Sequence, residues 1–136
     1  IQNLKSKMKI DVLTIFPEFF TEVFDFGIIR RAKHAEIVEI NVYDLRSFTT
    51  DKHRMTDDRP FGGGDGMVLK AEPIFRVVEQ ITGTCEQAKY PDWTRVVLLT
   101  PQGRVFKQAV AKEYADEAKH IILICGRYEG VDERVN

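Results

Sequence analysis

The sequence predicts an α/β domain with a mostly parallel sheet and helices on both faces. Two short runs of β-branched and aliphatic residues, 95–99 and 120–125, enclose a helix-length segment at 105–118. This order is typical of a βαβ unit, whose parallel strands are covered on both faces and are therefore apolar throughout. A third apolar run, at residues 9–16, opens the domain. No internal repeat or domain boundary interrupts these elements.

The first half of the chain continues the pattern. The strand at 9–16 is followed by Pro17, and proline favours the first turn of a helix, where the N–H it lacks would have no partner. Apolar residues then recur at helical spacing as far as Gly27, which ends the predicted helix. We expect the five phenylalanines between Phe16 and Phe26 to belong to the core. Alternation at 36–45 predicts a second strand.

The middle of the chain is less regular. Residues 46–66 form a long polar, Gly-rich stretch without periodicity, and loops of this length tend to be functional. Residues 71–81 predict a helix with one apolar face, and 82–94 predict a polar connector. The start, 1–7, is expected to be an extension or cloning remnant outside the fold, so that the domain runs from 8 to 136.

Composition narrows the class of protein. The 136 residues suffice for one core, and the hydrophobic fraction of 43% and charged fraction of 30% are ordinary for a globular domain. No apolar run approaches the roughly 20 residues that span a bilayer, and no secretory signal opens the chain. Cys85 and Cys125 stand far apart, without the spacing of a metal site or redox pair. We therefore expect a cytoplasmic protein with reduced thiols, no metal and no membrane contact.

Charge gives no global sign of a nucleic-acid partner, because the formal net charge is −1. Local basic clusters can still bind RNA, although most are solvated surface. Two such clusters occur. They are Arg30, Arg31, Lys33 and His34, and Lys52, His53, Arg54 and Arg59.

Two loops follow strands of the predicted sheet, at 100–104 and 126–134. Ligands of open parallel sheets gather outside the carboxyl ends of the strands. Glycines in both loops allow a close approach of backbone to a ligand. Tight turns, or a capped and ion-paired helix start at 129–134, explain the same residues without a ligand.

A third loop, 57–66, has four glycines in its last five residues. It matches neither a Walker A loop nor a dinucleotide fingerprint. A hinge or turn is one interpretation. The other is a loop that admits an RNA backbone or a flipped base, with Arg59 or His53 supplying charge. Asp57 and Asp58 are adjacent, so in an extended stretch they point opposite ways and cannot form a paired acid and base.

Three motifs in this order resemble one family. They are the strand with its proline at 8–17 (MKIDVLTIFP), the loop at 57–64 (DDRPFGGG) and the segment at 126–134 (GRYEGVDER). Together they resemble the tRNA (guanine-N1)-methyltransferases of the trefoil-knot (SPOUT) class, over residues 8–135.

The resemblance implies an α/β domain with a trefoil knot, a homodimer, and methyl transfer from S-adenosylmethionine to N1 of guanosine 37 in tRNA. It implies two walls of a cofactor site and one loop that faces the tRNA. The first wall is Leu98, Leu99, Thr100, Pro101 and Gly103. The second wall is Gly126, Tyr128 and Glu129. The loop facing the tRNA contains His53, Asp57, Arg59 and Gly62.

In the family, the final knot segment, the general base and a helical tRNA-binding domain follow the segment at 126–134. The resemblance therefore implies a base beyond Asn136, a knot that can be incomplete here, and no methyl transfer by these 136 residues alone. A non-catalytic RNA-binding or regulatory module with the same fold is the alternative. A nucleotide-binding domain that uses the glycines at 62–66 is another.

Overall fold

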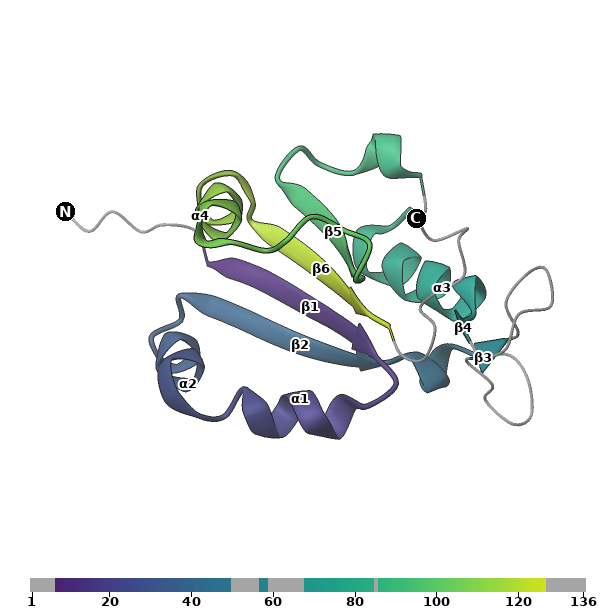
Figure 1. The fold of residues 1–136 in the computed structure, drawn as a ribbon, viewed down its shortest axis with the longest axis horizontal. Coiled ribbons are helices and arrows are strands. Elements are labelled where there is room, and N and C mark those ends of the chain that lie inside the picture. Colours follow the sequence, from purple (N-terminus) through teal and green to yellow (C-terminus); the bar gives the residue numbers. More distant parts are fainter. Residues whose placement is uncertain (1–6, 50–56, 59–67, 85, 127–136) are drawn as a thin grey trace.

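Four parallel strands form the main sheet, in the order β2-β1-β6-β5 (Figure 1). The structure, a computed structural model, describes residues 7–49, 57–58, 68–84 and 86–126. The strands of the sheet are β1 (Met8–Thr14), β2 (Val38–Asp44), β5 (Thr94–Leu99) and β6 (His120–Cys125). The predicted α/β class and the parallel sheet are confirmed.

Helices cover both faces of this sheet (Figure 1). They are α1 (Pro17–Val23), α2 (Gly27–His34), α3 (Ala71–Thr82) and α4 (Gln108–Glu117). The connections from β1 to β2 and from β5 to β6 step the same way across the sheet, whereas the connection from β2 to β5 steps back. Right-handed crossovers therefore put α1, α2 and α4 on one face and α3 on the other. Among the described residues, no helix is long and apolar enough to cross a membrane.

The best-packed core lies between α3 and the sheet. Alternate residues of β1 and β6 point toward α3, because side chains of a strand alternate between the two faces. Ala71 and Gly83 bound the packed helix, and Gly83 ends it in the left-handed conformation with φ 83°. The buried members of this cluster are Leu13, Ile15, Leu45, Ile74, Val77, Val78, Ile122 and Ile124.

Two predictions about the segment after β1 are wrong. Gly27 does not end a helical region; it begins α2 with φ 60°, a backbone conformation that glycine adopts without strain. The phenylalanines there do not all enter the core: Phe19 and Phe26 are 62% and 65% exposed, and Phe16 is 45% exposed. α1 is only seven residues long, so its apolar side chains outnumber the positions that can face the sheet.

The irregular stretch at 46–66 also contains structure that was not predicted. A 3₁₀ turn, η1 (Leu45–Phe48), follows β2 and packs against α3. Farther on, β3 (Asp57–Asp58) pairs antiparallel with β4 (Val68–Leu69). The connector after α3 holds another turn, η2 (Gln87–Lys89), and α4 begins three residues later than the predicted start at residue 105.

A buried carboxylate links three strands of the sheet. Asp11 of β1 is completely buried. One of its oxygens lies 2.5 Å from Nε2 of His120 on β6, and the other accepts a hydrogen bond of 3.0 Å from the amide of Asn41 on β2. A buried carboxylate is tolerated only with such partners, so this group fixes the alignment of β1 with both neighbours.

We predict that Asp11→Ala lowers the free energy of unfolding by about 2–4 kcal/mol, because His120 and Asn41 then lose a buried partner. Denaturant unfolding of the full-length protein measures this. Asp116→Ala is the matched control, since this exposed side chain on α4 should change stability by less than about 0.5 kcal/mol. Equal stabilities of the two variants would contradict the proposed role of Asp11.

Burial at the end of β6 raises the pKa of the Cys125 thiol from its ordinary value of 9.0 to about 11. Only the thiolate attacks alkylating reagents, and a raised pKa keeps the thiol neutral to higher pH. We predict slow alkylation of Cys125 by iodoacetamide below pH 9, with a rate that climbs toward pH 11 in the native protein. Mass spectrometry of the Cys125 peptide follows the reaction, and the urea-unfolded protein is the control. Native and unfolded profiles with one midpoint would refute the shift.

Candidate functional site

The register of β5 against β6 brings two of the predicted loops together. Leu99 lies opposite Cys125 in this register, so Thr100 and Gly126 leave neighbouring strands at the same edge of the sheet. All four strands of the main sheet are parallel, and this edge collects their carboxyl ends (Figure 1). It is the edge where parallel α/β sheets bind ligands.

The loop after β5 is a hydrogen-bonded turn. The amide of Gly103 donates to the carbonyl of Thr100 at 3.2 Å, and the amide of Gln102 donates to the Thr100 hydroxyl at 3.3 Å. A Cβ placed on Gly103 would meet only Thr100 atoms, at 3.5 and 3.6 Å, which are ordinary contact distances. Within the described residues, a side chain at position 103 therefore meets no steric obstacle.

Some side chains of the first predicted cofactor wall lie in the core, and others are exposed to solvent. Leu98 packs against the core cluster, whereas Leu99 is 50% exposed on the opposite face of β5. Thr100, Pro101 and Gly103 are exposed, as is Gly126. An apolar side chain next to turn backbone and glycine suits a flat heterocycle with polar edges, because the ring packs on the side chain while the backbone reads its edge.

More apolar surface continues beyond the turn. Val105 and Phe106 are 72% and 65% exposed, and the Phe106 ring lies 6.2 Å from that of Tyr114 on α4. Arg104 forms an exposed ion pair of 3.8 Å with Glu113. These side chains add exposed apolar surface along the connection from β5 to α4.

Several predicted site residues lie outside the described residues. These are Tyr128 and Glu129 of the second wall, and His53, Arg59 and Gly62 of the loop expected to face tRNA. Asp57 is described by its backbone, which pairs with Leu69 in the β3–β4 hairpin. The structure thus brings together six predicted residues, namely Leu98, Leu99, Thr100, Pro101, Gly103 and Gly126.

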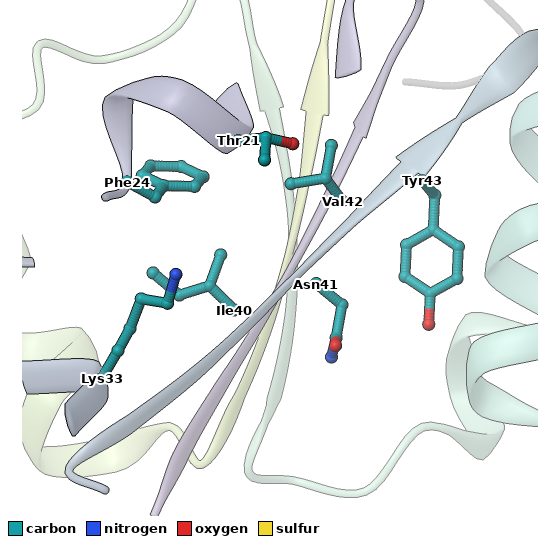
Figure 2. Close-up of a pocket in the computed structure, with 7 residues that line it drawn as sticks. All are labelled: Thr21, Phe24, Lys33, Ile40, Asn41, Val42 and Tyr43. Carbon is teal, nitrogen blue, oxygen red and sulfur yellow. The ribbon is translucent and has the colours of Figure 1, made fainter. Parts of the chain in front are cut away.

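A separate hollow of about 440 Å³ lies along the outer edge of β2. In Figure 2, Ile40 and Val42 face Thr21 of α1 and Phe24, the residue after that helix, whereas Asn41 and Tyr43 point to the other side of the strand. Of the described residues that line it, Lys33 alone is charged. The hollow lies on β2, two strands away from β6. The hollow and the loops after β5 and β6 are therefore two different candidate locations for the ligand site. We favour the loops, because they carry turn backbone and glycines at the ligand-binding edge.

Sequence reasoning missed the cluster of Asp11, Asn41 and His120. It took His120 as a plain start of a strand, and the structure adds its partner, 109 residues away in the chain. The cluster lies within the sheet rather than at its carboxyl edge, which assigns it to stability. The described residues contain no group of three or more His, Cys, Asp or Glu side chains that could hold a metal ion.

Comparisons with known proteins agree with this geometry. Residues 8–136 match the family described as tRNA (guanine-1)-methyltransferase TrmD. The chain is 55% identical over 128 residues to a tRNA (guanine-N(1)-)-methyltransferase of Heliobacterium modesticaldum, covering 94% of this chain and 47% of that protein. It is 52% identical over 128 residues to the protein of that name from Dictyoglomus turgidum, covering 94% of this chain and 49% of that one.

A solved structure extends the likeness to the fold. The crystal structure of tRNA (m1G37) methyltransferase from Aquifex aeolicus matches with a TM-score of 0.78 and 35% identity, over 95% of this chain and 55% of that one. The chain spans about half the length of the curated relatives it matches. The family match covers nearly all of the 136 residues, and the chain therefore belongs to the tRNA (guanine-1)-methyltransferase TrmD family.

Proposed function

We propose that this protein transfers a methyl group from S-adenosylmethionine to N1 of guanosine 37 in tRNA. The observation that carries the proposal is the register of β5 and β6, which sets the loop at 100–104 beside Gly126 in a chain of this family. The names of its relatives, which specify guanine N1, support the reaction. The name of the Aquifex aeolicus protein, which specifies m1G37, supports the position.

The described residues fit S-adenosylmethionine as the methyl donor. Leu99 offers an exposed apolar surface for adenine, and Gly103 and Gly126 leave the backbone accessible beside it. When bound, this group supplies an electrophilic methyl on a sulfonium. Tyr128 and Glu129 complete the second wall in our proposal, on the strength of the family motif in which they stand.

The chemistry also requires a base. Guanine N1 carries a proton at neutral pH, and a carboxylate must accept it as the new bond forms. Asp44, which ends β2 at the same edge, is engaged: its side chain accepts a hydrogen bond of 2.9 Å from the amide of Arg46. The resemblance to the family places the base beyond Asn136, and we adopt that placement in the proposal.

The proposal also covers the contact with tRNA, the oligomeric state, the cellular location and the chain topology. The loop that faces the tRNA contains His53, Asp57, Arg59 and Gly62, because these residues belong to the family's Gly-rich loop and its basic neighbour.

A homodimer is supported by exposed apolar side chains such as Phe26 and Ile28, which are 65% and 80% exposed. With tRNA as its substrate, the protein acts in the cytoplasm. A trefoil knot, expected from the family, is part of the same proposal.

We predict that the full-length protein transfers labelled methyl from S-adenosylmethionine to tRNA carrying guanosine 37. Transfer to the same tRNA with adenosine 37 should be at background, because adenine has an amino group where guanine has the O6 carbonyl and lacks the N1 proton, so a site built for guanine loses its hydrogen-bond partners. The measurement is acid-precipitable label over time. Folded protein that binds tRNA but transfers no methyl would favour the non-catalytic RNA-binding module and overturn the proposal.

The variant Gly103→Ala tests the cofactor wall. The added methyl group is tolerated by the protein itself, so stability should be unchanged while S-adenosylmethionine affinity falls about tenfold, which is about 1.4 kcal/mol. Isothermal titration measures the affinity. Ala88→Val adds bulk to another exposed loop, η2, and should leave it unchanged. An unaltered affinity in Gly103→Ala would remove this turn from the site.

A further inference from the structure

One face of α2 is basic along its whole length. Gly27, Arg30, Arg31 and His34 are spaced at i, i+3, i+4 and i+7, which places them on the same side of a helix. Both arginines and the histidine are exposed, and α2 contains no acidic residue. The basic cluster already evident in the sequence thus places two exposed guanidinium groups and an exposed imidazole on one side of a helix.

This surface is concave. Gly27, Arg30, Arg31, His34 and Ala35 line a shallow hollow of about 650 Å³, here named the basic hollow. A Cβ on Gly27 would meet no atom within 4 Å, so the floor of the hollow beside the arginines is open. Among the described residues that line it, none carries a carboxylate that could neutralise the two arginines.

The basic side chains of the basic hollow do not stabilise the fold through ion pairs within the described residues. None of Arg30, Arg31 and His34 forms an ion pair with another residue in the described part of the chain. The packing of α2 uses its other side, where Ile29 and Ala32 are half-buried. Lys33 does not line the basic hollow. In Figure 2 its side chain lies beside Ile40, in the separate hollow along β2.

The position of the basic hollow sets how long a ligand must be to contact both this hollow and the candidate cofactor edge. α2 leads into the start of β2, so the hollow lies at the amino ends of the strands, opposite the candidate cofactor edge (Figure 1). The seven residues of β2 separate the two ends by about 20 Å at about 3.3 Å per residue. A ligand that contacts both the basic hollow and the cofactor edge must therefore be extended.

We propose that the basic hollow binds backbone phosphates of the tRNA substrate, at a distance from the methylated base. The inference rests on the proposed function, because that function supplies a long polyanion to this protein. Arginine pairs with phosphate through two parallel hydrogen bonds, and Arg30 and Arg31 are free to do so. Phosphate contacts of this kind position a nucleic acid without reading its sequence.

A purely structural role makes a different prediction. Basic groups in the last turn stabilise a helix through its macrodipole, and Arg31 and His34 stand in that turn. Removing them would then lower the melting temperature of the protein. It would leave the affinity for tRNA and its dependence on salt unchanged.

The test is the double variant Arg30→Gln/Arg31→Gln in the full-length protein, with tRNA affinity measured by fluorescence anisotropy over a series of KCl concentrations. We expect tRNA to bind about tenfold more weakly. The slope of log affinity against log salt should fall by about 0.7–0.9 for each lost phosphate contact. KM for tRNA should rise while kcat at saturating tRNA and the affinity for S-adenosylmethionine stay unchanged.

The control is Lys112→Gln/Lys119→Gln, which removes two exposed charges from α4 and from the residue before β6. It should leave affinity and salt slope at their wild-type values. If the arginine variant methylates normally, with unchanged tRNA affinity and salt slope, the basic hollow does not bind tRNA, and the proposed function stands. The same conclusion follows if the variant loses only binding to anionic phosphatidylglycerol vesicles, which would assign the surface to a membrane. A wild-type protein that neither binds nor methylates tRNA overturns the inference together with the proposed function.

Discussion

Parallel pairing of β5 with β6 is the constraint on which the candidate site depends. It places Leu99 opposite Cys125 and so sends two loops, well separated in the chain, from neighbouring strands at one edge. Had either strand run the other way, Thr100 and Gly126 would lie at opposite ends of the sheet. The alignment of this pair with β1 is fixed in turn by Asp11, whose carboxylate contacts His120 on β6.

Sequence patterns predicted the elements whose burial leaves a clear signature. β6 and the buried face of α3 belong to this group, since apolar runs and helical spacing reveal them directly. α2 was missed because glycine usually ends helices, whereas Gly27 starts one. The exposure of Phe19 and Phe26 was also missed, because an apolar residue in a sequence does not show whether this chain or another surface covers it.

The candidate site was predictable as far as its loops follow strands. The βαβ pattern predicted that the loops at 100–104 and 126–134 leave the carboxyl ends of parallel strands, and the register of β5 with β6 agrees for Thr100 and Gly126. The Asp11–His120 contact was not predictable, since no local pattern links residues 109 positions apart. The basic surface of α2 was visible as a run of charges, but separating Arg30 and Arg31 from Lys33 required the helix.

Amide hydrogen exchange of the full-length protein with S-adenosylhomocysteine tests most directly whether the loops at the carboxyl edge form the cofactor site. S-adenosylhomocysteine is the product of the proposed transfer, so it reports binding without turnover. We predict slower exchange for the amides of Leu99, Thr100, Gly103 and Gly126, and unchanged exchange along α2 and β2. Protection centred on the hollow along β2, with the amides after β5 and β6 unaffected, would contradict this placement of the site.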